Sequence, residues 1–149
     1  MSQILYHIQL YGGCSKELLD ALQVQQNRAA RLVCRRPWRT STKVLFQEIG
    51  WMTVKQLMVH HSILSLYKTR KAGVPKYVHE IISVPFIQQT RLAKTGGIRD
   101  IRDFKKGIGQ SSYIHRAITY WNAMPSDLRQ ESNLEAFIPK LKDWVKMNY

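Results

Sequence analysis

The chain has 149 residues, of which 44% are hydrophobic, and it carries a net charge of +13 with a pI near 10.0. This length suits one domain, and this apolar content excludes a disordered tail. No apolar run approaches the ~20 residues that a membrane span needs, and the start of the chain lacks the features of a signal peptide. We therefore expect no membrane partner and an intracellular location, either nuclear or cytoplasmic.

The positive charge is concentrated in two blocks. Residues 28–43 sum to +6 and residues 84–116 sum to +5, whereas residues 117–149 are neutral overall. Excess charge repels itself in a compact fold unless an acidic partner relieves it, and nucleic acid is the commonest such partner. Charge that served only solubility would be spread more evenly. The two blocks therefore favour RNA and/or DNA as the partner.

The first part of the chain has helical periodicity. Residues 3–11 are a short apolar segment that ends at a Gly-Gly pair, and their abrupt start predicts the end of a longer element. Ser15 is a predicted N-cap, and apolar residues repeat at helical spacing from there to about Arg36. We expect this helix to bury its leucine side, which includes Leu18 and Leu32, and to expose its arginines elsewhere.

Proline and glycine divide the next part of the chain. Pro37 ends the first helix, and a short helix is predicted over about residues 42–49. A capping box at residues 53–56 opens a long helix with one apolar side, which extends to about Lys71. A further short helix is predicted over about residues 76–82.

Residues 83–110 are basic and hold few large apolar residues, which predicts a long irregular linker. A loop of this length is uncommon in a compact domain, so it is either functional or a solvated flexible segment. A weak hairpin around Gly96-Gly97 is an alternative prediction, although the neighbouring apolar residues do not alternate as a strand requires. The charge favours a loop that faces nucleic acid, and a solvated linker is an equal alternative.

The last part of the chain is again helical. A serine at position 111 or 112 caps a predicted helix, and a single turn follows over residues 126–129. Ser132 and Glu135 have capping-box spacing before the final helix, in which Pro139 predicts a kink or a late start. The predicted fold is therefore all-α, a single small domain of about five to six helices. Its parts are a leading segment (1–13), a first helical half (15–82), the basic linker (83–110) and a second helical half (111–149).

The residue types that carry most enzyme chemistry are scattered. Metal-dependent polymerases and nucleases need converging carboxylates, but the closest pair, Asp100 and Asp103, is flanked by arginines in the linker. Adjacent His60 and His61 point to different helical faces, without a Cys or an acid four residues further on. No glycine-rich phosphate loop or nucleophile motif is present. We therefore predict a non-enzymatic chain without a metal or a cofactor, and packing roles for both histidines.

The first basic block predicts a binding face. Arg28, Arg31 and Arg35 lie three and four residues apart, which places them on one helical face. Like charges at that spacing repel, so their grouping favours an anionic partner, and a solvated helix face is the alternative. The candidate nucleic-acid contacts are Arg28, Arg31, Arg35, Arg36, Trp38, Arg39 and Lys43 in this block, and Arg91, Lys94, Arg99, Arg102, Lys105 and Lys106 in a second, mobile clamp.

The tryptophans divide into two groups. Trp38 follows a proline and precedes an arginine, and we expect it to face a partner as a flat stacking surface beside charge. Trp121 ends a predicted amphipathic helix, where a core position is favoured over a stacking platform for bases. Trp51 and Trp144 are expected in the core for the same reason.

Five motifs in order resemble the C-terminal region of reverse transcriptases of non-LTR (LINE-type, Jockey-like) retrotransposons. They are QNRAAR (26–31), IGW (49–51), PKYV (75–78), WNAMP (121–125) and FIPKLK (137–142). Two positions depart from the family pattern, because its RSF element is QSSY here (110–113) and Pro139 replaces a helix-friendly residue. The polymerase palm with its metal site is absent from the sequence, so polymerase activity does not carry over to this chain.

The resemblance implies a helical module that follows the polymerase and helps to hold template RNA or target DNA. The leading hypothesis is a non-catalytic nucleic-acid-binding module that contacts mainly phosphates. The alternative is a structural or protein-interaction module derived from a transposon fragment. That module would dock a polymerase domain or a second copy through an exposed apolar patch near Ile4, Leu5 and Ile8.

Overall fold

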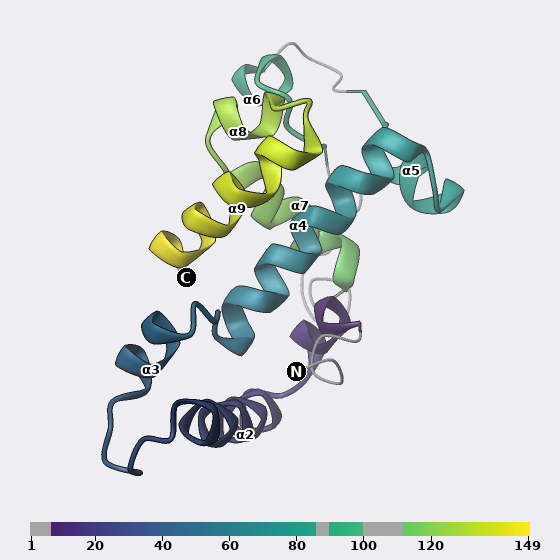
Figure 1. The fold of residues 1–149 in the computed structure, drawn as a ribbon. Coiled ribbons are helices and arrows are strands. Elements are labelled where there is room, and N and C mark those ends of the chain that lie inside the picture. The colour runs from purple at the N-terminus through teal and green to yellow at the C-terminus, as the bar shows by residue number, and fades with distance from the viewer. Residues whose placement is uncertain (1–6, 86–89, 100–111) are drawn as a thin grey trace.

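A computed structural model describes residues 7–85, 90–99 and 112–149 of the chain. These residues form helices and contain no strand (Figure 1), so the predicted all-α class is confirmed. The elements are η1 (Ile8–Gly13), α2 (Lys16–Cys34), α3 (Thr42–Glu48), α4 (Val54–Ala72), α5 (Lys76–Ile82), α6 (Arg91–Lys94), α7 (Tyr113–Ala123), α8 (Ser126–Gln130) and α9 (Leu134–Asn148). They outnumber the predicted helices because two further short elements form, η1 in the leading apolar segment and α6 in the predicted irregular linker.

Helix α4 lies at the centre of the fold (Figure 1). Its capping box forms as predicted, because Thr53 Oγ1 accepts from Gln56 N (3.2 Å) and Gln56 Oε1 accepts from Thr53 N (2.9 Å). The sequence predicted one apolar side, but α2, α5, α7, α9 and η1 all contact this helix. Its buried residues therefore surround the axis and include the polar side chains of His60, Ser62 and Thr69.

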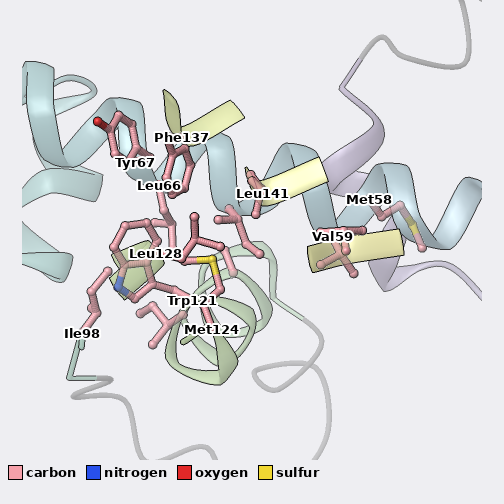
Figure 2. Close-up of a cluster of buried hydrophobic side chains, with 14 of the residues drawn as sticks. Met58, Val59, Leu66, Tyr67, Ile98, Trp121, Met124, Leu128, Phe137 and Leu141 are labelled. Atoms are coloured by element: carbon pink, nitrogen blue, oxygen red, sulfur yellow. The ribbon is translucent and has the colours of Figure 1, made fainter. Parts of the chain in front are cut away.

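The main core lies where α4, α7 and α9 meet (Figure 2). Trp121 and Phe137 are 1% and 0% exposed, and the ring of Tyr67 stacks on that of Phe137 with 4.2 Å between centroids. The expected core position of Trp121 is confirmed. Full burial of a large apolar side chain contributes about 1.5–3 kcal/mol, so this cluster supplies much of the stability of the fold.

The segment after α6 is anchored on α7, although the sequence predicted an irregular linker there. Trp121 Nε1 donates to Gly96 O (3.0 Å), and the Asn122 side chain accepts from Ile98 N (2.9 Å) and donates to Ile98 O (2.8 Å). Gly96 takes the left-handed conformation, with φ of 74°. Described residues 90–99 therefore form a helical turn and an anchored extension. The alternative prediction of a hairpin at Gly96-Gly97 is wrong for these residues.

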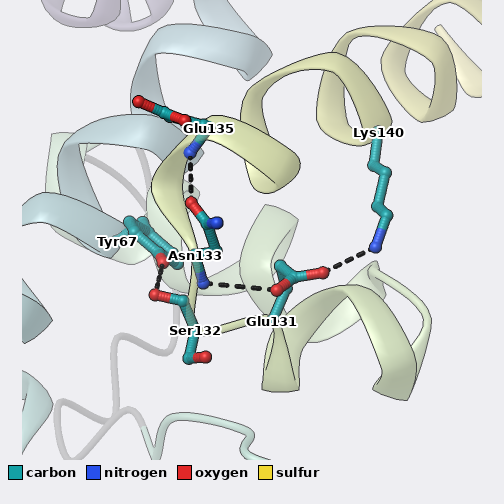
Figure 3. Close-up of polar contacts among 6 residues, drawn as sticks. All are labelled: Tyr67, Glu131, Ser132, Asn133, Glu135 and Lys140. Carbon is teal, nitrogen blue, oxygen red and sulfur yellow. Dashed lines mark hydrogen bonds and ion pairs between the residues drawn. The ribbon is translucent and has the colours of Figure 1, made fainter.

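Helix α9 begins later than the predicted capping box (Figure 3). Asn133 is the N-cap in place of Ser132, and its Oδ1 accepts from Glu135 N (2.9 Å). The Ser132 carbonyl accepts a hydrogen bond from the Tyr67 hydroxyl (2.7 Å), which ties this turn to α4. The helix then continues through Pro139, so its start is not delayed as far as that proline.

Helix α2 packs on the rest of the fold through its glutamines. Gln26 is fully buried and donates to Met52 O (2.8 Å), and Gln23 Oε1 accepts from Val54 N (2.8 Å) at the start of α4. Next to these bonds, Ala30 packs in a small second core with residues of α3. The inward side of α2 therefore combines the two glutamines with apolar residues such as Leu19 and Ala30.

The predicted burial of the leucine side of α2 is wrong for three of its residues, whereas Leu19 on that side packs against the main core. Leu18 is 63% exposed, Leu32 is 80% exposed and Val33 is 60% exposed. Because each helical residue turns by about 100°, Leu18 and Leu32 lie a quarter to a third of a turn away from Gln26. The neighbours that α2 meets in the fold, and not its hydrophobic periodicity, decide which side is covered.

Candidate nucleic-acid interface

The first basic block, residues 28–43, spans the end of α2 and the turn that leads into α3. The helix ends in a Schellman pattern, in which Arg36 N donates to Arg31 O (3.1 Å). Arg35 is its left-handed C-cap residue, with φ of 50°. The helical face that holds Arg28 and Arg31 therefore stops before Arg35, and the block offers charge from both a helix end and a turn.

Trp38 lies in this turn and is 75% exposed. Arg31 Nε donates to Trp38 O (3.2 Å), which ties the turn back to the helix. The Arg39 guanidinium carbon lies 5.3 Å from the centroid of the indole ring, within the range of a cation–π contact. The turn therefore presents a flat aromatic surface beside positive charge.

One cation of the first block has a carboxylate partner in the described part of the chain. Arg36 pairs with Glu48 at 3.4 Å, and both side chains are exposed. Exposed pairs of this kind contribute only about 0–1 kcal/mol. The remaining cations of the block form no ion pair with any described carboxylate. Their charge is therefore open to an external anion.

A pocket of about 420 Å³ lies beside this block, between α2, α3, the start of α4 and the end of α9. Lys43, Phe46 and Trp51 line it, together with Lys146 from near the end of the chain. Trp51, which the sequence predicted in the core, is half-buried: it packs against the small second core and also lines this pocket. Sequence reasoning missed Lys146 because it lies in the charge-neutral last part of the chain, and only folding brings it near α3.

Helix α6, which carries Arg91 and Lys94 of the second basic block, lies at the opposite end of α4 from the first block (Figure 1). The start of α4 bonds to α2 through Val54, whereas Arg70 near its end donates to Gly96 O (3.1 Å) just after α6. These two points of α4 are about 24 Å apart at 1.5 Å of rise per residue. The two blocks therefore do not form one continuous patch over the described residues.

The residues predicted for the second clamp have different environments. Arg91 and Lys94 are exposed on α6. Arg99 is half-buried, and its guanidinium donates to Pro85 O (3.3 Å). The other three predicted contacts lie outside the described residues, namely Arg102, Lys105 and Lys106. Among the described residues of this clamp, Arg91 and Lys94 are therefore the exposed ones.

The pKa values of the two adjacent histidines of α4, His60 and His61, are lowered, which favours their neutral forms. Burial, with the nearby charges of His61 and Lys142, lowers the pKa of His60 to about 4. Burial and the charge of Lys68 also lower the pKa of His61. His60 is 8% exposed, so at neutral pH it packs without charge, in line with the predicted packing role.

The described residues hold no group of three or more His, Cys, Asp or Glu side chains that could bind a metal ion. In the same part of the chain, no helix is long and apolar enough to cross a membrane. Comparison with known protein families, curated proteins and solved structures finds no match. Function is therefore inferred from the residues of the site itself.

Replacing Arg35 with Gly should stabilise the chain by about 1 kcal/mol, because glycine avoids the ~1–2 kcal/mol cost of the left-handed conformation. Urea unfolding followed by circular dichroism measures this change. Arg28→Gly is the matched control, because it removes the same charge from a helical position, where glycine should destabilise by about 0.5–1 kcal/mol. Equal effects of the two substitutions would contradict the role of the C-cap conformation.

Proposed function

We propose that this chain is a non-catalytic module that binds RNA or DNA, mainly through phosphate contacts. The observation that carries the proposal is a group of exposed cations without a carboxylate partner among the described residues. They are Arg28, Arg35, Arg39 and Lys43. Holding like charges together costs free energy, and an anionic ligand offsets that cost.

Each part of the site matches a part of a nucleic acid. Guanidinium groups bind phosphate oxygens in a bidentate manner, and an exposed indole such as Trp38 can stack on a base. Phosphate contacts position a ligand without reading its sequence. We therefore propose binding with little sequence preference.

The resemblance to the C-terminal region of non-LTR retrotransposon reverse transcriptases supports the same proposal. The QNRAAR motif supplies Arg28 and Arg31 to the first basic block, and the WNAMP motif supplies Trp121 and Asn122, which anchor the segment after α6. In such elements the corresponding module follows the polymerase and is thought to hold template RNA or target DNA. The palm motif is missing here, so we propose no polymerase activity for this chain.

A salt titration tests the proposal. Binding of the chain to a labelled RNA strand and to a DNA duplex of about twenty base pairs is measured by fluorescence anisotropy over a range of KCl concentrations. If about four phosphates are neutralised, log affinity should fall with log salt at a slope near −3.6 for the duplex and near −2.8 for the single strand. No binding to either probe at low salt would refute the proposal.

A second candidate is a protein-interaction module, and the exposed apolar residues of α2 favour it. Leu18, Leu32 and Val33 lie on the surface of a long helix. The patch that the sequence predicted for this role is located differently, because Ile8 is fully buried and residues 4 and 5 lie outside the described residues. Light scattering on the wild type and on Leu32→Lys, together with the salt titration, separates the two candidates. Self-association that Leu32→Lys abolishes, in a chain that shows no salt-dependent binding of nucleic acid, would favour the protein-interaction module.

A further inference from the structure

We infer that the pocket beside Lys43 accommodates one unpaired nucleotide of a bound nucleic-acid strand. This inference rests on the proposed function and assigns one nucleotide of the bound strand to a specific pocket. A base can enter a pocket only when it is free of its pairing partner. The pocket therefore distinguishes single-stranded from duplex ligands, which the phosphate contacts of the first basic block do not.

The apolar part of the pocket is aromatic. The rings of Phe46 and Trp51 lie 6.4 Å apart between centroids and are tilted by 34°. Both line the pocket, and its volume of about 420 Å³ falls within the range of about 300–1,000 Å³ that is usual for small-ligand sites. Every base has a flat π-face that stacks on aromatic side chains. Two adjoining rings therefore suit a base of any identity.

The charged part of the pocket is positive. Lys43 and Lys146 line it, and none of its lining residues is a carboxylate. Lys146 Nζ donates to Gly50 O (3.4 Å), which places its ammonium group at the loop just before Trp51. An anionic group attached to a ring that stacks in the pocket would contact one or both lysine ammonium groups. A nucleotide joins a ring and a phosphate in this way.

The polar wall of the pocket is a fixed network of amides. Gln23 Nε2 donates to Asn27 Oδ1 (2.8 Å), and Thr53 N donates to Gln56 Oε1 (2.9 Å). These bonds orient both side chains and leave the NH₂ groups of Asn27 and Gln56 as hydrogen-bond donors for a ligand. Amide NH₂ groups donate to the carbonyl and ring-nitrogen acceptors of base edges. The wall is thus preorganised for a base.

The position of the pocket links it to the proposed interface. Lys43 belongs both to the first basic block and to the pocket wall. A strand whose phosphates contact Arg39 and Lys43 therefore reaches the mouth of the pocket. This continuity favours a nucleotide of the bound strand over a separate small molecule.

The test compares two probes, an oligouridylate of about twelve nucleotides and a blunt RNA duplex of similar length. Trp51→Ala should weaken binding of the oligouridylate by about 5- to 150-fold, the range measured for loss of one stacking aromatic. Binding of the duplex should change by less than about twofold, because its bases stay paired. A variant that failed to fold would lose binding to both probes, and circular dichroism would detect the loss of helical structure.

Lys146→Gln provides the second arm, because this exposed side chain lies outside both the core and the first basic block. It should weaken oligouridylate binding by about fivefold at 0.1 M salt, as expected for one phosphate contact to a single strand. Lys76→Gln, at an exposed position of α5, is the control with equal charge loss and should have a smaller effect.

The outcomes separate this inference from the proposed function. If Lys146→Gln and a folded Trp51→Ala bind oligouridylate like the wild type, while neutralising Arg28, Arg35 and Arg39 weakens binding, the pocket inference is overturned and the proposed function stands. If the wild-type chain binds neither probe at low salt, both are overturned. Selective loss of single-strand binding in both pocket variants supports the inference.

Discussion

Changing Arg28, Arg35 and Arg39 together to Gln is expected to lower affinity for duplex DNA several hundredfold at 0.1 M salt. Each phosphate contact contributes about 0.9 to the salt slope, so loss of three should flatten a slope of about −3.6 to about −0.9. The three side chains are exposed and unpaired with described carboxylates, so their neutralisation should leave the fold intact. Anisotropy titrations at several KCl concentrations give both quantities.

The control for that variant removes the same charge at the other end of the fold. Lys68, Lys71 and Lys76 are all exposed, on the last part of α4 and the start of α5. Their combined change to Gln lowers the net charge equally, and it should weaken binding far less if the first basic block is the contact surface. Equal losses in the two triple variants would mean that net charge, and not the block, determines affinity.

Replacing Trp121 with Ala is expected to destabilise the chain by about 3–5 kcal/mol, the usual cost of removing a large aromatic side chain from a packed core. The side chain is 1% exposed, and its Nε1 donates to Gly96 O. Since the free energy of unfolding of such domains is about 5–15 kcal/mol, the urea concentration at the unfolding midpoint should fall strongly in this variant. Circular dichroism is the appropriate signal, because the substitution also changes fluorescence.

Trp38→Ala is the matched control, since it is the same substitution at a side chain that is 75% exposed. Surface changes of this kind usually alter stability by less than about 0.5 kcal/mol. It should instead weaken nucleic-acid binding, because Trp38 belongs to the proposed interface. A stability loss at Trp38 that matched the loss at Trp121 would contradict the division of the tryptophans into core and surface groups.

Local signals in the sequence predicted most of the long helices and several of their ends. Ser15 caps α2, Thr53 with Gln56 forms the capping box of α4, and Gly73 ends α4 in the left-handed conformation. These features depend on groups within four residues of one another, so the sequence contains the interacting partners. The short helix α6 was missed although Thr90 caps it locally, whereas η1 packs on α4 and α7, which are distant in the sequence.

The candidate site was predictable in part. The cluster of arginines and the exposed Trp38 follow from composition and spacing within residues 28–43. The pocket was not predictable, because its walls come from α2, α3, α4 and α9, and Lys146 is remote from Lys43 in the sequence. Nor could the sequence show that α6 and α2 lie at opposite ends of α4 (Figure 1).

The sequence by itself determined the all-α class, the N-terminal caps of α2 and α4 and the uneven distribution of positive charge. Each of these depends on residue type and on neighbours along the chain. Only the tertiary structure decided that α2 packs through Gln23 and Gln26 while Leu18 and Leu32 stay exposed. The physical reason is that burial depends on which surface a helix meets, and periodicity specifies only which residues share a side.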